Sequence, residues 1–225
     1  MKRSNYTVGL IMLTFFVISF LTNITGPLIP DIIKGFNLSL TLVALLPFAF
    51  FIAYGVMSVP SGMLLEKYNE KKMMTAAFSV AFFGSLLLAL SPNYLSAVLS
   101  LFLIGCGMAI LQVVINPLLR TAGGEEHYAF NSILAQLIFG LASFVSPLVY
   151  SGMVFKLQVE EQSGGLFGLL GRFTPDNLPW ISLYWLFAVI SLVMIAVILA
   201  SRFPKVELSQ DEKAGAFQTY INLFK

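Results

Sequence analysis

Long apolar stretches, each followed by a polar segment, make up most of this 225-residue chain. Six such runs are visible, at residues 8–29, 40–65, 73–90, 95–119, 129–155 and 180–200. Each is close to or longer than the ~20 residues that a helix needs to cross a bilayer. The strands of a membrane β-barrel would be about half as long and would alternate apolar and polar residues. The pattern therefore predicts an all-α membrane protein with six transmembrane helices.

Composition supports a membrane protein and argues against several other classes. Hydrophobic residues make up 58% of the chain and charged residues 11%, far from the usage of soluble globular proteins. The net charge of +2 is too small to suggest binding to nucleic acid. Cys106 is the single cysteine, and we expect the single histidine, His127, in a solvated loop beside Glu125 and Glu126. The sequence shows no nucleophile–base pair, phosphate loop or metal cluster, so we expect neither an enzyme nor a cofactor.

Basic residues are concentrated in alternate polar segments. If the N-terminus is cytoplasmic, the cytoplasmic segments hold Lys2, Arg3, Lys67, Lys71, Lys72, Arg120, Arg202, Lys205, Lys213 and Lys225, and the outer ones hold Lys34, Lys156 and Arg172. The positive-inside rule then places both termini in the cytoplasm, in a multi-pass protein of the cytoplasmic (inner) membrane. The long outer segment 156–179 contains Leu166, Leu169 and Leu170, which fit either a short interfacial helix or a flexible loop.

The six runs contain no Asp, Glu, Lys, Arg or His. Proton relays and sites for charged ligands inside membranes normally need an ionisable group. We therefore expect the spans to provide neither a titratable proton carrier nor a charge that would bind an ionic substrate.

Neutral polar residues are the candidate binding groups of the spans. Gln112 and Asn116 share one helix face about 6 Å apart, and Pro117 frees the backbone carbonyl of Val113. Carboxamides both donate and accept hydrogen bonds, which suits sugar hydroxyls, and an aromatic side chain adds an apolar face for a ring. The candidate substrate-binding residues are Asn23, Tyr54, Gln112, Asn116, Asn131 and Gln136. The alternative is that these amides bond neighbouring helices, at roughly 1 kcal/mol each.

Several motifs carry a resemblance to a known family. The segment PSGMLLEKYNEKK, with Gly62, Glu66, Lys71 and Lys72, resembles the cytoplasmic-loop signature of major facilitator transporters, a gating motif. The segments FLTNITGPLIP (20–30), the stretch 105–117 with its Asn-Pro step, and LAQ (134–136) resemble the fucose/glucose-galactose permeases of that superfamily. The similarity covers essentially the whole chain, as the N-terminal half of such a sugar symporter.

The resemblance implies a six-helix bundle of two inverted three-helix repeats, pairing with a second six-helix half around a midplane site for a neutral hexose such as glucose, galactose or fucose. Residues 1–203 would form this bundle, and 204–225 would begin the central cytoplasmic loop. The second half is expected to be absent from this chain. A truncated, non-transporting remnant or an assembly partner of a separate C-terminal half is the alternative.

Departures from the family pattern bear on ion coupling. The proton-coupled fucose permeases carry an acidic residue where this chain has Gly26, and a second one where it has Gln112. Phe139 also stands where a polar residue is expected. The resemblance therefore implies that coupling through this half uses Na⁺ held by neutral oxygens, rather than H⁺, or is absent, as in a uniporter.

Overall fold

The computed structural model describes residues 4–159, 173–175 and 177–204, and within them the chain is helical without strands. The helices are α1 (Asn5–Asn23), α2 (Thr25–Phe36), α3 (Leu40–Lys67), α4 (Glu70–Leu90), α5 (Tyr94–Gly123), α6 (Tyr128–Val159) and α8 (Ser182–Ala200), with 3₁₀ turns at η1 (Glu125–His127) and η2 (Pro179–Ile181). Six helical spans in this part of the chain are long and apolar enough to cross a membrane. The all-α prediction is confirmed.

Short polar side chains begin several of the helices. Ser4, Ser39, Asn69 and Asn93 each accept a hydrogen bond from the backbone N–H three residues later, and so cap α1, α3, α4 and α5. Such a cap satisfies one of the N–H groups that a helix start leaves unpaired. These capping residues separate consecutive apolar runs, which explains why the polar segments between spans are so short.

The first span is longer than the sequence pattern predicted, and this corrects one expectation. The helix bends at Ile24 and continues as α2 to Phe36, beyond the predicted end at residue 29. The bend follows from Pro27, which has no N–H to donate to the carbonyl of Asn23 and whose ring crowds that carbonyl. Asp31 therefore lies in the same continuous helix as the first apolar run, two residues beyond the predicted end of that run.

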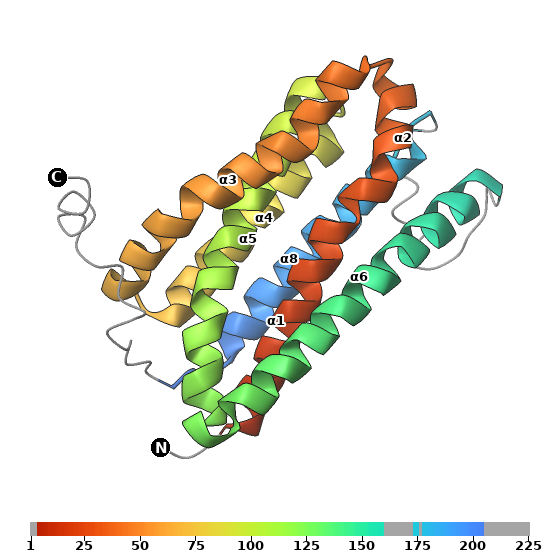
Figure 1. Cartoon of the computed structure of the whole chain (residues 1–225). Coiled ribbons are helices and arrows are strands. Elements are labelled where there is room, and N and C mark those ends of the chain that lie inside the picture. Colours follow the sequence, from red (N-terminus) through yellow and green to blue (C-terminus); the bar gives the residue numbers. More distant parts are fainter. Residues whose placement is uncertain (1–3, 160–172, 176, 205–225) are drawn as a thin grey trace, which may run out of the picture.

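In Figure 1, α3, α4 and α5 lie together on one side of the bundle, and α1, α6 and α8 lie together on the other. The first span packs against α6, and α5 packs against α3 in the corresponding way. The start of α1 meets the end of α5, where Ser4 and Val8 lie beside Ala122 and Gly123, and α4 packs on α8. Exchanging the first, second and third spans with the fourth, fifth and sixth leaves these contacts in place, whereas the close packing of α4 on α5 has no counterpart of similar extent between α8 and α1. This is the arrangement expected of two inverted three-helix repeats.

Glycines set the close packing of α5. A Cβ atom at Gly105 would lie 2.5 Å from the carbonyl oxygen of Phe50 on α3, and one at Gly107 would lie 2.6 Å from that of Ala77 on α4. Contacts this short leave no room for a side chain. Small residues allow membrane helices to approach closely. These glycines explain how α5 is held between α3 and α4.

The first span is attached by side-chain hydrogen bonds and apolar packing, in addition to the backbone bond from the Ser4 N–H to the Ala122 oxygen. Ser19 Oγ donates to the carbonyl oxygen of Phe139 at 2.6 Å, and Ser146 Oγ donates back to that of Phe20 at 2.9 Å. The backbones of α1 and α8 stay farther apart, with Phe20 and Phe187 edge to face, their ring centroids 6.3 Å apart. Hydrogen bonds fix α1 against α6, and aromatic rings fill the space beside α8.

Candidate substrate site

One face of α5 carries Gln112 and Asn116 and is called the open face here. Most other positions in the half of α5 nearer Gly123 are buried, but Asn116 is exposed and Gln112 is half-buried. Asn116 Nδ2 donates to the backbone oxygen of Gln112 at 3.1 Å. The Gln112 Oε1 atom is buried and has no hydrogen-bond partner among the described residues. An unpaired buried acceptor costs about 1–3 kcal/mol, so this atom is well placed to accept a hydroxyl.

Two further candidates lie at a similar depth on other helices. The rise of 1.5 Å per residue places Gln112 about 16 Å from the Gly123 end of α5, and Gln136 about 12 Å from the Tyr128 start of α6. Tyr54 lies about 20 Å from the Lys67 end of α3 on the same count. All three distances start from one end of the bundle, named the basic end here for its residues Lys67, Lys71, Lys72, Arg120 and Arg202.

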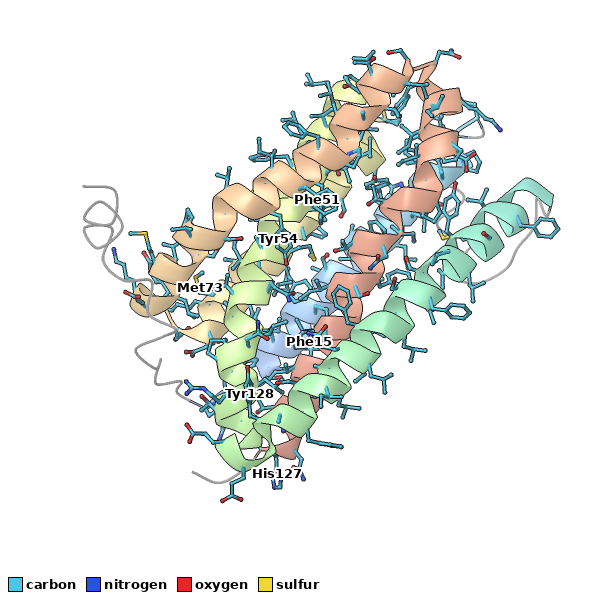
Figure 2. The ribbon with its side chains drawn as sticks, in the orientation of Figure 1. Phe15, Phe51, Tyr54, Met73, His127 and Tyr128 are labelled. Atoms are coloured by element: carbon cyan, nitrogen blue, oxygen red, sulfur yellow. The ribbon has the colours of Figure 1, made fainter. Side chains whose placement is uncertain are left out.

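The side chains at this depth have a mixed polar and aromatic character. Gln136 is exposed, and it shares a face of α6 with Ser132, Gly140 and Ser143. The half-buried Tyr54 packs its ring on Phe50, with centroids 6.2 Å apart, and Figure 2 shows it near Phe51, about midway along α3. Amides, hydroxyls and an aromatic ring are the groups that would bind a ring-shaped molecule with hydroxyl groups.

The remaining two candidates lie elsewhere. Asn23 is about 27 Å along α1 from Asn5, nearer the opposite end, and its Nδ2 donates to the backbone and hydroxyl oxygens of Ser19 at 2.9 and 3.1 Å. Asn131 is buried near the basic end, against Gly123, where a Cβ would lie 2.3 Å from its Nδ2. By this count Gln112, Gln136 and Tyr54 lie roughly 12–20 Å from the basic end, Asn116 lies one turn from Gln112, and Asn23 and Asn131 lie nearer the two ends of the bundle.

The segment that resembles the gating motif joins α3 to α4 at the basic end. Gly62 and Glu66 lie in the last turns of α3, with Glu66 exposed, and Lys72 is exposed at the start of α4. Lys71 Nζ donates to the carbonyl oxygens of Leu199 and Ser201, at 2.6 and 2.9 Å. A cation at a helix C-terminus pairs with its unsatisfied carbonyls and with the negative end of its dipole. Lys71 therefore ties the start of α4 to the end of α8.

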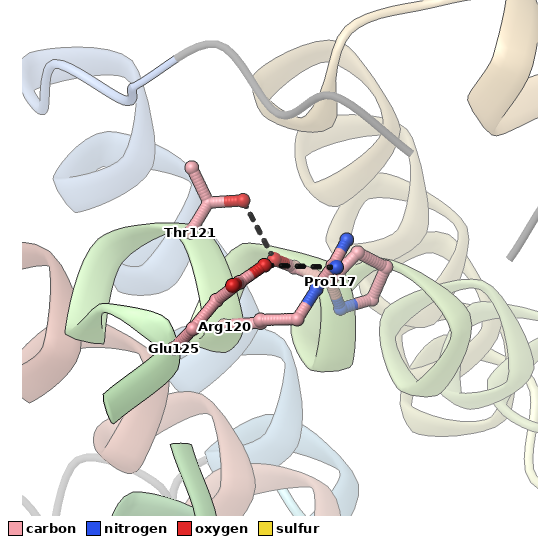
Figure 3. A network of polar contacts seen from close by, with 4 residues as sticks. All are labelled: Pro117, Arg120, Thr121 and Glu125. Atoms are coloured by element: carbon pink, nitrogen blue, oxygen red, sulfur yellow. Dashed lines mark hydrogen bonds and ion pairs between the residues drawn. The ribbon is translucent and has the colours of Figure 1, made fainter. Parts of the chain in front are cut away.

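Polar contacts of Arg120 and Thr121 stabilise the C-terminal end of α5 (Figure 3). Arg120 forms an ion pair with the exposed Glu125, with Nη1 and Oε1 3.7 Å apart, and Thr121 Oγ1 donates to the carbonyl oxygen of Pro117 at 3.0 Å. His127 is exposed in the following 3₁₀ turn, as the sequence predicted (Figure 2). This polar cluster marks where α5 leaves the apolar layer.

Sequence reasoning missed the polar contacts between the first span and α6. Ser19 and Ser146 give no signal, because serines are common in membrane helices and neither stands in a motif. Tyr150 donates a hydrogen bond to Asp31, whose charge had placed it outside the predicted span. The apolar spacing of Leu28 and Ile32, both buried, continues past Asp31 and could have shown that the helix goes on.

The outer segment predicted at 156–179 lies largely beyond what the structure describes. Its Leu166, Leu169 and Leu170 are outside the described residues, as is the segment after Pro204. The choice between an interfacial helix and a loop, and the domain boundary at 203, therefore stay predictions.

Comparison with known proteins gives consistent matches. The Major Facilitator Superfamily model matches residues 11–221. A glucose/galactose transporter of Brucella abortus is 32% identical over 152 residues, covering 65% of this chain and 37% of the relative. The L-fucose-proton symporter of Escherichia coli is 23% identical over 222 residues, covering 92% and 50%. The chain thus spans about half the length, or less, of these curated relatives.

Solved structures show the same fold. The crystal structure of the transporter FucP in the outward conformation superposes with a TM-score of 0.72 at 21% identity, covering 98% of this chain and 56% of that one. The crystal structure of a variant of the Escherichia coli fucose:proton symporter gives 0.69 at 22% identity, covering 96% and 54%. The six spans described above therefore correspond to one half of a complete transporter fold.

Proposed function

Because this chain belongs to the Major Facilitator Superfamily, we propose that it is the N-terminal half of a transporter that moves a neutral hexose by alternating access. Its matched relatives are named as glucose/galactose and fucose transporters, which supports glucose, galactose or fucose as the substrate class. A second six-helix half would complete the site from the other side. Residues 1–203 would be the first bundle, and 204–225 would begin the loop that joins the two.

The observation that carries this proposal is the neutral amide pair on the open face of α5. Gln112 keeps a buried acceptor without a partner in the described chain, and Asn116 lies exposed one turn away. The described charged side chains of the spans are found toward either end, at Asp31, Lys34, Glu66, Lys67, Glu70, Lys71, Lys72 and Arg120. A site at the depth of Gln112 therefore offers amide hydrogen bonds without a charge, which favours an uncharged polar substrate.

Ion coupling follows from the same neutral groups. Since Gln112 and Gly26 stand where proton-coupled relatives carry acids, substrate binding at this depth involves no proton exchange. Amide and carbonyl oxygens are ligands for a hard cation such as Na⁺. Transport is accordingly proposed to be coupled to Na⁺ or to be passive.

The membrane orientation is part of the proposal. The basic end would face the cytoplasm, because Lys67, Lys71, Lys72, Arg120 and Arg202 all lie there. Both termini would then be cytoplasmic, in the inner membrane. The end that carries Asp31 and Lys34 would face outward.

Uptake in sealed vesicles tests the function. Vesicles that contain this chain together with a second six-helix half should take up labelled glucose, galactose or fucose, and an excess of unlabelled hexose should compete. Vesicles with this chain alone should show no uptake, because alternating access needs two bundles that move against each other. A sugar acid such as gluconate should not compete. Absence of uptake for all three hexoses would contradict the proposal and favour a non-transporting role.

A sodium gradient and a protonophore test the coupling. If Na⁺ is coupled, removing the sodium gradient should abolish accumulation above the external concentration, whereas a protonophore at constant Na⁺ should leave it intact. Loss of accumulation on adding the protonophore would show that a proton carrier operates in the complete transporter.

A further inference from the structure

Three exposed cations from the ends of three helices form a cluster at the basic end. This cluster, called the basic patch here, consists of Lys67 at the end of α3, Lys72 at the start of α4 and Arg202 just after α8. Lys71 joins two of these elements, because its Nζ donates to the carbonyl oxygen of Ser201, next to Arg202, at 2.9 Å. Of the two carboxylates described on these segments, Glu66 is exposed and Glu70 is buried. The basic patch therefore presents more positive than negative charge.

Lys71 neutralises the one helix end beside the basic patch that would repel an anion. The last carbonyl groups of a helix carry partial negative charge, which is the negative end of the helix dipole. At the end of α8, the carbonyl oxygens of Leu199 and Ser201 accept hydrogen bonds from Lys71 Nζ at 2.6 and 2.9 Å. The charge of Lys71 is therefore used within the bundle, and the exposed cations beside it remain available to an outside anion.

Tyr68 indicates the level of the lipid headgroups at this end. Its ring is exposed, and Lys67 Nζ lies 5.7 Å from the ring centroid. Tyrosine is enriched where a membrane meets water, because its ring is apolar and its hydroxyl is polar. Lys67 and Lys72 lie one and four residues from Tyr68, so they reach the same level. The basic patch is therefore placed where lipid phosphate groups lie.

The outer face of α4 continues from the basic patch as an apolar surface. Lys72, Ala76 and Phe83 are exposed and share one face of the helix. Phe83 lies about 16 Å along the axis from Lys72, close to half of a ~30 Å hydrocarbon layer. The hydroxyls of Thr75 and Ser79 donate to backbone oxygens one turn earlier in α4, each at 2.8 Å, so they need no outside partner. On α8, which packs on α4, the exposed residues include Leu192, Val193 and Leu199.

The exposed surfaces of α5 and α6 have a different character. They carry the amides of Asn116 and Gln136 within the spans. Lipid chains offer no hydrogen bonds to an amide, so such a surface is costly against the hydrocarbon layer. The outer faces of α4 and α8 carry no such cost. Acyl chains are therefore accommodated on α4 and α8, next to the basic patch.

We propose that the basic patch and the adjoining outer faces of α4 and α8 form a binding site for an anionic phospholipid. The cations bind the headgroup phosphate, and the acyl chains lie along the apolar surface below it. Charge selects an anionic headgroup, because the choline cation of phosphatidylcholine offsets the charge of its phosphate. One bound lipid then joins the ends of α3, α4 and α8. This site does not depend on the proposed sugar transport.

Native mass spectrometry of the intact chain in detergent tests the site, with phosphatidylglycerol or phosphatidylcholine of identical acyl chains added. Phosphatidylglycerol should bind more tightly than phosphatidylcholine. Lys72→Met and Arg202→Met should each lower the association constant for phosphatidylglycerol about fivefold, the factor expected for losing one cation near a lipid surface. Neither should change the binding of phosphatidylcholine. Lys72→Arg keeps the charge and should keep the affinity.

The matched control is Lys34→Met, which removes an exposed lysine of α2 at the opposite end of the bundle and should leave phosphatidylglycerol binding unchanged. Thermal unfolding without added lipid checks that every variant is folded. Inorganic phosphate at matched ionic strength should not displace phosphatidylglycerol, because it lacks acyl chains. Displacement by inorganic phosphate, equal affinity for the two lipids, or unaltered affinity in the double variant Lys72→Met and Arg202→Met would each overturn the proposal.

Discussion

The two central helices of the bundle occupy equivalent places in the two repeats but are held differently. Gly105 and Gly107 let α5 press against the backbones of α3 and α4. The corresponding helix, α1, is held by the hydrogen bonds of Ser19 and Ser146 with α6, and by aromatic side chains beside α8. Glycines bring α5 against two neighbouring backbones, whereas α1 is held by side-chain hydrogen bonds and apolar packing in addition to the backbone bond from Ser4 to Ala122.

This difference separates a fixed helix from an adjustable one. Glycine contacts leave no room for sliding, since any shift drives side-chain atoms into a neighbouring backbone. Serine hydroxyls and ring contacts can break and re-form at a new position for a small cost. The candidate amides Gln112 and Asn116 are therefore carried by the rigid helix, and the bend at Ile24 belongs to the adjustable one.

The largest effect is expected from filling the glycine contact of α5. Gly105→Ala should lower the free energy of unfolding by about 1–3 kcal/mol, because the added methyl collides with the backbone of Phe50. Unfolding of the chain by SDS titration in mixed micelles measures it. The control is Gly140→Ala on α6, where a Cβ meets nothing within 4 Å and stability should stay the same or rise. Equal effects of the two substitutions would show that the close contact at Gly105 contributes no additional stability.

The next effect concerns the open face of α5. Gln112→Ala should raise the dissociation constant for the hexose up to about tenfold in the complete transporter, since one hydrogen bond of roughly 1 kcal/mol is lost. Asn131→Ala should leave the constant unchanged, because that amide is buried against Gly123. Equilibrium binding of labelled sugar checks both. Unaltered affinity in Gln112→Ala would exclude this side chain from the site.

A smaller effect is expected where α1 meets α6. Ser19→Ala and Ser146→Ala should each cost about 0.6 kcal/mol, the average for such bonds between membrane helices, and the double variant about twice that. Ser79→Ala is the matched control, because its hydroxyl bonds within α4, to the oxygen of Thr75 at 2.8 Å. The same SDS titration applies. A loss beyond about 3 kcal/mol in the double variant would show that α1 is as rigidly fixed as α5.

The smallest effect is expected at the basic end. Lys71→Met should destabilise the chain by about 0.3–1 kcal/mol, because the carbonyls at the end of α8 lose their cation. Lys72→Met changes an exposed neighbour and should have no measurable effect. Thermal unfolding in detergent compares the two. Identical melting temperatures would show that the Lys71 contact contributes no net stability.

The number and position of the spans could be predicted from hydropathy, but their ends and rotations could not. The charge of Asp31 predicted a span boundary because a charge normally marks water, whereas Tyr150, far away in the sequence, gives it a partner inside the bundle. Helix ends depend on such distant contacts. A rule that stops a span at its first charge will therefore shorten helices whose charge is paired.

The orientation of α6 about its own axis determines which of its amide side chains face the candidate site. Asn131 and Gln136 are alike in chemistry and five positions apart, yet one is buried and the other exposed. Apolar residues cover every side of a membrane helix, because lipid and protein interior are both apolar, so periodicity says little about facing. The orientation comes instead from Ser146 and Tyr150, whose partners on the first span cannot be deduced from α6 alone.

The N-terminus of the bundle is joined to residues made much later in synthesis. The Ser4 N–H donates to the oxygen of Ala122 at 3.1 Å, and the Tyr6 hydroxyl meets Ser201 Oγ at 2.8 Å, 195 residues away. At roughly 5–20 residues per second, a ribosome needs on the order of 10–40 s to travel from Tyr6 to Ser201. During that time the first span lacks its contact with Ser201, although Ala122 has already been made. The contact between Tyr6 and Ser201 can therefore form only after the last helix has been made. The order of translation thus sets when the first helix can reach its final position.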